Sequence, residues 1–241
     1  MHLPRLDPDS AAPFPPADSA RRKPDGLLAF GGDLSAQRLM NAYRHGIFPW
    51  FSEGDPILWW SPDPRTVFDT GALHLSRRFR RKMRDCTWSI RVDEDFEAVI
   101  AACADTPRHD QNGTWILPPM QAAYAELHRL GHAHCVAVFD DARLVGGIYG
   151  VHAGPVFCGE SMFSLASGGS KIALAALCHL LASHGVRWLD AQMHTPHLAS
   201  LGAIQMPRHE YLSALSEPDA ARLPHAGWHS LLAGIRASDI V

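Results

Sequence analysis

The sequence lacks the patterns that mark secreted, disulfide-bonded and membrane-spanning proteins. It has no Cys-x-x-Cys pair, and its five cysteines are scattered and odd in number, which favours reduced thiols. The N-terminus is rich in proline and charge and has no apolar signal-peptide core. No apolar run reaches the roughly 20 residues that a membrane span needs. We therefore expect a soluble, cytoplasmic protein.

Several catalytic motifs are also missing. The 15 histidines include no His-Glu-x-x-His and no Cys–His grouping with zinc spacing, so we expect no metal site. Residues 159–163 begin like the Gly-x-Ser-x-Gly turn of serine hydrolases, but Phe163 replaces the last glycine. Residues 167–171 form an incomplete phosphate loop, whose backbone could bind an anion. Glycines that merely allow a turn explain that loop equally well.

Composition indicates a globular chain of one large or two small domains. It has 241 residues, of which 46% are apolar, and a net charge of −3. This charge excludes a globally basic nucleic-acid binder but leaves room for a local basic patch. An internal repeat is not apparent.

The N-terminal part is irregular and aromatic. A proline-rich arm covers residues 1–24, a helix capped by Ser35 is predicted over 36–44, and aromatic residues crowd 48–51 and 57–60. We place a boundary near residue 62, which gives a small N-terminal domain over 1–62 and a larger domain over 63–241.

The second part alternates between helix and strand patterns. Helices are predicted over 76–84, 95–104, 119–130, 170–183 and 197–201, and strands over 134–139, 144–152, 156–163, 187–191 and 204–205. Hairpins come first and a crossover later, which predicts a mixed sheet with helices on its faces. The fold class is α+β.

Two acids stand inside apolar strands. Asp190 and Gln192 are two residues apart, so on a strand they would lie side by side on one face. Glu160 is embedded in a similar apolar stretch. Burying an unpaired polar group costs about 2–7 kcal/mol, so these residues are either fully hydrogen-bonded structural groups or a working site.

A basic helix and several tryptophans suggest RNA. Arg77, Arg80, Arg81 and Arg84 fall on one arc of the predicted helix, and no acid lies there to neutralise them. Guanidinium groups match phosphate oxygens, although a charge run is more often an ordinary solvated face. Tryptophans usually belong to a core, yet an exposed one stacks well on an unpaired base.

Several collinear motifs resemble the leucyl/phenylalanyl-tRNA–protein transferase family. They span about residues 24–212 and comprise Pro24–Ala29, Gly31–Ser35, Gly46–Phe51, Trp59–Arg65, Gly113–Ile116, Leu144–Gly147, Gly159–Ser164, Ser170–Lys171, Asp190 with Gln192, and Ser200–Ala203. The resemblance implies a small N-terminal α/β domain followed by an acyl-CoA N-acyltransferase (GNAT)-like domain with a mixed sheet.

The resemblance also implies an activity. Leu or Phe, and less readily Met, would move from its tRNA ester to the α-amine of a protein beginning with Arg or Lys, marking that protein for degradation under the N-end rule. No cofactor is implied.

Site residues follow from the same resemblance. An apolar amino-acid pocket is implied at Ile148, Phe157, Glu160, Met162, Leu174, Leu177, Leu181 and Leu189. Trp50 and Trp115 would stack on the terminal adenosine of the tRNA, and the arginine helix would hold its phosphates. The chain departs from the family at Ile148 and Leu177, where relatives carry Met and Phe, and at Gly168-Gly169. These departures affect the preference between Leu and Phe.

The expected mechanism is aminolysis of the aminoacyl ester. Asp190 and Gln192 would form one hydrogen-bonded unit that orients the amine, with Asp190 accepting or relaying its proton. The 2′-hydroxyl of the adenosine is an alternative relay that the sequence leaves open. Two rival functions are an acetyl-CoA-dependent N-acetyltransferase, which would need a glycine-rich pyrophosphate turn, and a non-catalytic RNA-binding module, which would leave Asp190 and Gln192 without a role.

Overall fold

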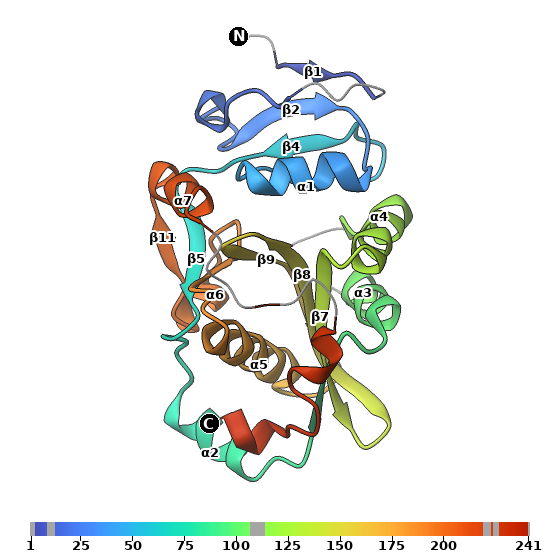
Figure 1. The fold of residues 1–241 in the computed structure, drawn as a ribbon, viewed down its shortest axis with the longest axis vertical. Coiled ribbons are helices and arrows are strands. Elements are labelled where there is room, and N and C mark those ends of the chain that lie inside the picture. The colour runs from blue at the N-terminus through green and yellow to red at the C-terminus, as the bar shows by residue number, and fades with distance from the viewer. Residues whose placement is uncertain (1–2, 9–12, 107–113, 219–222, 224–226, 241) are drawn as a thin grey trace.

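The computed structural model describes residues 3–8, 13–106, 114–218, 223 and 227–240 (Figure 1). Its helices are α1 (Ala36–Arg44), α2 (Arg77–Arg84), α3 (Phe96–Asp105), α4 (Pro118–Arg129), α5 (Gly169–Ser183), α6 (Pro196–Ser200) and α7 (Arg208–Leu215), with short 3-10 turns at Ala17–Ser19, Trp228–Ser230 and Ala237–Ile240. Its strands are β1 (Arg5–Leu6), β2 (Leu27–Gly31), β3 (Phe48–Pro49), β4 (Leu58–Trp60), β5 (Arg65–Asp69), β6 (Ser89–Val92), β7 (Ala133–Asp140), β8 (Arg143–Ala153), β9 (Val156–Ser164), β10 (Trp188–Asp190) and β11 (Ile204–Met206).

The larger sheet has seven strands in the order β11-β5-β10-β9-β8-β7-β6. Strands β6 to β9 pair with one another in antiparallel fashion, whereas β10 returns after the α5 crossover and pairs with β9 in parallel. β5 and β11 complete the other edge in antiparallel pairing. The predicted α+β class and the mixed sheet are therefore confirmed.

The smaller sheet has the order β1-β2-β4-β3 and lies at one end of the molecule, with α1 between it and the rest (Figure 1). Its strands all come from residues 5–60, and every strand of the larger sheet comes from residue 65 onward. The division into domains at residues 62 and 63 stays a prediction.

Helices cover both faces of the larger sheet. Alternate residues of β7 enter two different apolar clusters, with Val136 and Val138 in the one that contains α5 and Cys135 and Ala137 in the one that contains α3 and α4. Side chains of a strand point alternately to the two faces, so a strand buried on both faces is apolar throughout. This explains the unbroken apolar run from 135 to 139.

The sequence patterns missed the six strands β1 to β6 and the helix α7. Of the strands in the larger sheet, β5 was missed because it contains the charged Arg65, and β6 because it contains Ser89 and Arg91. The strand predicted over 187–191 is one residue shorter at each end, Trp188–Asp190. None of the described helices is both long enough and apolar enough to cross a membrane.

The N-terminus of α5 approaches β8 closely because glycines meet there. A Cβ on Gly169 would overlap the carbonyl oxygen of Val145 and lie 2.9 Å from the Cα of Gly146. We expect Gly169→Ala to lower the free energy of unfolding in urea by about 1–3 kcal/mol through overpacking. As a control, Gly71→Ala should stay within about 0.5 kcal/mol, since its nearest neighbour is a carboxylate oxygen of Asp69 at 3.5 Å. Equal stability of the two variants would contradict this packing argument.

Candidate active site

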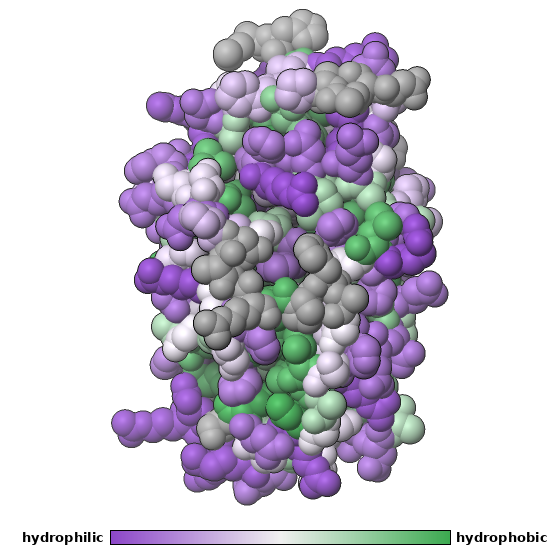
Figure 2. Space-filling view, in the orientation of Figure 1, coloured by the Kyte–Doolittle hydropathy of each residue, from purple (hydrophilic) through white to green (hydrophobic). Residues whose placement is uncertain are grey.

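A cavity of about 330 Å³ is lined by residues of β8, β9, β10, α5 and α6. Figure 2 shows apolar side chains gathered along the middle of this face of the molecule, over α5, between polar margins. The residues that line the cavity are mostly apolar: Phe68, Ile148, Gly159, Glu160, Ser161, Met162, Leu174, Leu189, Asp190, Ala191, Gln192, Thr195, His197 and Leu198.

Five of the eight predicted pocket residues line this cavity, namely Ile148, Glu160, Met162, Leu174 and Leu189. The other three, Phe157, Leu177 and Leu181, are buried in the core that contains α5, among residues that support the cavity lining from behind. Their placement as direct pocket walls stays a prediction. A pattern of apolar residues on a helix identifies which face is buried, but not which turn of that face reaches a cavity.

Asp190 is completely buried and held by a bidentate ion pair. Arg65 Nε and Nη2 donate to its two carboxylate oxygens, each at 2.8 Å. Tyr211 adds a hydroxyl donor at 2.9 Å, and the backbone N–H of Gln192 adds a fourth at 2.9 Å. A carboxylate has about four acceptor positions, so the fold uses all of them. Asp190 is a fixed anchor for the end of β10.

Arg65 is as deeply buried as its partner, with an exposed fraction of 1%. Its guanidinium lies between the rings of Phe48 and Tyr211, 4.7 Å from each centroid. Burial lowers the pKa of Arg65, but the charge of Asp190 outweighs burial and keeps the pKa above its ordinary value. The ion pair joins β5 to β10, and Arg65 also donates to the carbonyl of Gly46 at 3.1 Å.

Gln192 does not stand beside Asp190 on a strand. Its φ is 55°, in the left-handed region, so the chain turns immediately after β10. This turn directs the side-chain amide to Glu160, where Nε2 donates to Oε1 at 3.0 Å. The predicted side-by-side arrangement of Asp190 and Gln192 is therefore wrong. The two residues are linked through the backbone N–H of Gln192.

A β-bulge places Glu160 in the cavity. In the pairing of β8 with β9, Tyr149 lies opposite Ser161 and Gly150 lies opposite Gly159, so Glu160 is the extra residue. Bulges commonly redirect a side chain beside an active site. A Cβ on Gly150 would overlap the carbonyl oxygen of Cys158, which explains the glycine opposite the bulge.

The surroundings of Glu160 alter its affinity for protons. Tyr124 donates to its Oε2 at 2.8 Å, and a short hydrogen bond connects the Tyr124 and Tyr43 hydroxyls. Burial raises the pKa of Glu160 to about 7, and donation by the two tyrosines only partly offsets that effect. A carboxyl group with such a pKa exchanges protons near neutral pH, as a general base requires.

Sequence reasoning missed the residues that hold this network together, namely Arg65, Tyr43, Tyr124 and Tyr211. Arg65 carried a usable signal, because an arginine before the apolar run Val67–Phe68 must find a buried acid. The tyrosines carried none that separates them from ordinary core residues. Thr195, His197 and Leu198 reach the cavity from the loop and short helix after β10.

The two tryptophans predicted to stack on an adenosine are not among the described residues that line the cavity. Trp115 is buried, with 8% of its surface exposed, and so offers little free ring face. Trp50 is half-buried and packs edge-on against Trp60 at a centroid distance of 5.6 Å. Stacking by Trp50 and by Trp115 stays a prediction.

The arginine arc is on the exterior. All four predicted residues of α2 are exposed, and Met83 on the opposite side of the helix is completely buried. The helix therefore has the orientation that its pattern predicts. Binding of phosphates by the arc stays a prediction.

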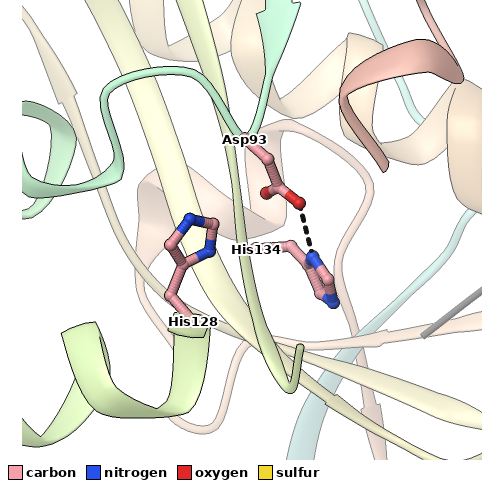
Figure 3. Close-up of side chains that lie close together, drawn as sticks. All are labelled: Asp93, His128 and His134. Carbon is pink, nitrogen blue, oxygen red and sulfur yellow. Dashed lines mark hydrogen bonds and ion pairs between the residues drawn. The ribbon is translucent and has the colours of Figure 1, made fainter. Parts of the chain in front are cut away.

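A second polar cluster lies away from this cavity, at the edge of β7 (Figure 3). Asp93, His128 and His134 come together there from three different elements. His134 Nδ1 and Asp93 Oδ2 are 2.8 Å apart, and His134 stacks on Trp228 at 3.7 Å. Two ligands of a tetrahedral zinc ion at about 2.1 Å would be about 3.4 Å apart. The pair therefore has the spacing of a hydrogen bond rather than that of two metal ligands.

The fold and the cavity together define a class of enzyme. An apolar hollow ends at a carboxyl group poised to exchange a proton and at an amide, so it can bind an apolar group and deprotonate a nucleophile beside it. This arrangement is that of a group-transfer enzyme.

Comparison with known proteins identifies the family. The profile described as "Leucyl/phenylalanyl-tRNA protein transferase" matches residues 67–216, and the profile of the N-terminal domain of that transferase matches residues 32–63. The chain belongs to the leucyl/phenylalanyl-tRNA–protein transferase family and is an aminoacyltransferase, as its motifs predicted.

Curated relatives support this assignment over nearly the whole chain. A leucyl/phenylalanyl-tRNA–protein transferase of Xanthomonas campestris pv. campestris (strain B100) is 61% identical over 225 residues, covering 92% of this chain and 90% of the relative. One of Xylella fastidiosa (strain 9a5c) is 58% identical over 215 residues, covering 88% of each. Among solved structures, a GCN5-related N-acetyltransferase from Kribbella flavida aligns with a TM-score of 0.37 and 14% identity, over 69% of this chain and 59% of that one.

Proposed function

We propose that this enzyme transfers Leu or Phe, and less readily Met, from its tRNA ester to the α-amine of a protein that begins with Arg or Lys. The observation that supports this assignment is the apolar cavity that ends at the hydrogen-bonded pair of Glu160 and Gln192. The transferred side chain occupies the hollow, and the ester bond lies at its polar end. A cytoplasmic location, where charged tRNA is abundant, belongs to the same proposal.

Side-chain selection follows from the cavity walls. The cavity is walled by the apolar side chains of Ile148, Met162 and Leu174. Of these side chains only that of Met162 has a hydrogen-bonding atom, its weakly accepting sulfur. A polar amino-acid side chain would therefore lose its hydration in the cavity without gaining hydrogen bonds. Unbranched and γ-branched side chains enter, and a β-branched side chain presses on the wall nearest the ester. Because one methylene is worth only about 1–3 kcal/mol, rejection of Ile is incomplete.

The chemical step is attack of the acceptor amine on the ester carbonyl. A C–N bond forms, the bond from the carbonyl carbon to the 3′-oxygen of the adenosine breaks, and a proton passes from the nitrogen to the departing oxygen. Gln192 donates Nε2 to Glu160, which leaves its amide oxygen to accept a hydrogen bond from the amine. Glu160 accepts the proton, because its pKa of about 7 makes it basic at neutral pH without holding the proton permanently.

Asp190 acts as a positioning residue in this mechanism. Its oxygens are engaged by Arg65, Tyr211 and Gln192, so it fixes the turn from which the Gln192 amide projects. This role replaces the direct proton acceptance that the sequence suggested for Asp190. The 2′-hydroxyl of the adenosine can complete the relay, since a proton passed by Glu160 must still reach the 3′-oxygen.

The test is incubation of the protein with leucyl-tRNA and a peptide that begins with Arg. We expect a product extended by one Leu at its N-terminus, detected by mass spectrometry. Valyl-tRNA and a peptide that begins with Asp serve as matched controls and should give little product. Acetyl-CoA titration should show no binding. Acetylation of the peptide, or RNA binding without any Leu transfer, would support one of the two rival functions instead.

A further inference from the structure

A second cavity adjoins the first. It has a volume of about 510 Å³ and is lined by Ser76, Arg78, Phe79, Lys82, Ser164, Ser167, Gly168, Ser170, Lys171 and His197. His197 lines both cavities. The two cavities are therefore neighbours that share the His197 side chain, and the second one extends to α2.

The lining of this second cavity is cationic. Arg78 and Lys82 are four residues apart on α2 and so lie on one face of it, while Lys171 comes from the first turn of α5. Among the described lining residues none is acidic, and the ion pairs of the described residues involve none of these three cations. Three positive charges thus converge without a counter-charge.

Uncharged groups hold two of these cations in place. Lys82 Nζ donates to the carbonyl of Ser167 at 2.7 Å, and Lys171 Nζ lies 5.5 Å from the centroid of the Phe79 ring. An ammonium has three donors, so Lys82 keeps two for a ligand. The lysines are oriented toward the cavity but not neutralised.

The site depends on side chains and not on the end of the α5 helix. The N–H of Gly169 is bonded to Ala166, and that of Ser170 is bonded to Ser164 Oγ at 2.8 Å. These backbone donors are already occupied. Burial, followed by the charge of Lys171, lowers the pKa of His197, so the positive charge of the cavity comes from Arg78, Lys82 and Lys171.

We infer that this second cavity binds a phosphodiester of the single-stranded RNA end whose terminal adenosine carries the amino acid. The inference rests on the proposed function and adds a binding site to it. Guanidinium and ammonium groups are the side chains that bind phosphate oxygens most strongly. Arg77 and Arg81 continue the positive surface around α2 from Arg78. The strand therefore runs from the amino-acid pocket past His197 and Lys171 to the exposed arginine arc.

The experiment compares three leucyl donors that differ in their number of phosphodiesters: leucyl-adenosine, leucyl-CpA and leucyl-CpCpA. For the wild-type protein we expect kcat/KM with an Arg-initiated peptide to rise when the phosphodiester that occupies the cavity is added. In Lys82→Ala and in Lys171→Ala, the factor by which that phosphodiester raises kcat/KM should be about tenfold smaller than in the wild type, which is the effect of one charge-assisted hydrogen bond. The step at which the loss appears identifies the phosphodiester.

Direct binding of uncharged CpCpA provides a readout independent of transfer. We expect Kd to increase about tenfold in either lysine variant, and the slope of log Kd against log salt to fall by about 0.7 per lost contact. Arg143→Ala removes an exposed arginine of β8 outside both cavities and should change neither quantity. Circular dichroism confirms that each variant is folded.

Three outcomes decide the inference. Unchanged kcat/KM ratios and unchanged CpCpA affinity in both lysine variants would overturn it. Displacement of CpCpA by an equal concentration of inorganic phosphate would also overturn it, because the ligand would then be free phosphate and not the RNA strand. Absence of Leu transfer from every donor by the wild type would defeat the proposed function alone, since CpCpA binding still tests the cavity.

Discussion

Glu160→Gln is expected to lower the rate of Leu transfer by about 10²- to 10⁴-fold, the usual contribution of a general base. Glutamine keeps the size and the acceptor oxygen but cannot take a proton. For the wild type, kcat should rise with pH through about 7, the pKa of Glu160. Deprotonation of the acceptor amine produces a second rise near its own pKa of about 8. The variant should keep only the second rise. Single-turnover rates measured across this pH range test the prediction.

Matched variants separate this role from general disruption. Glu126→Gln removes an exposed carboxyl group of α4 and should leave the profile unchanged. Tyr124→Phe removes a donor that stabilises the Glu160 carboxylate, so the lower inflection should move to higher pH. A wild-type inflection that persists in Glu160→Gln would assign the base elsewhere, with the adenosine 2′-hydroxyl as the first alternative.

Glu160→Gln lowers the transfer rate but should increase the stability of the folded protein at alkaline pH relative to the wild type. The pKa of Glu160 rises from an ordinary 4.5 to about 7 on folding, so the protonated form favours the folded state. That contribution is complete below about pH 4.5 and is lost as the pH rises through about 7. Relative to the wild type, Glu160→Gln should therefore gain about 1–3 kcal/mol in free energy of unfolding between acidic and alkaline pH. A group can thus destabilise the fold and still be needed for catalysis.

Asp190→Asn is expected to lower the free energy of unfolding by about 3–5 kcal/mol, because it leaves Arg65 as a buried charge without a partner. Both side chains are essentially inaccessible to water, so solvent cannot compensate. The carboxamide also cannot accept all four of the donors that Asp190 satisfies. Urea denaturation at neutral pH measures the loss.

Two comparisons make this second prediction specific. Arg187→Met breaks the exposed ion pair with Asp69 and should cost no more than about 1 kcal/mol. The double variant Arg65→Met with Asp190→Leu removes both buried charges and should be more stable than Asp190→Asn. If Asp190→Asn costs no more than Arg187→Met, the buried pair does not hold β5 to β10 as the geometry indicates.

The sequence pattern identified most of the secondary structure that surrounds the site. The helix at 170–183 and the strands at 134–139, 144–152 and 156–163 have largely apolar patterns, and the structure confirms them as α5 and β7 to β9. The pattern failed at β5, where a charged residue enters the strand because its partner lies 125 positions away in the chain. The residues near Arg65 in the sequence therefore do not indicate which residue is its buried partner. It also failed at Gln192, because the apolar run before it gave no sign of a left-handed turn.

The residues themselves determined that this chain would be a mixed α+β protein, that Glu160 and Asp190 would be acids within apolar strands, and which family it belongs to. Those properties depend on hydrophobic periodicity and on motifs several residues long, and both are local. Only the tertiary structure decided the different environments, and so the different roles, of Asp190 and Glu160. Asp190 received an arginine and became a structural anchor, whereas a bulge placed Glu160 beside two tyrosines and an amide, with no cation of the described residues at hydrogen-bonding distance. Burial without a hydrogen-bonded cation is what raises a carboxyl pKa, and that is a property of neighbours brought together by folding.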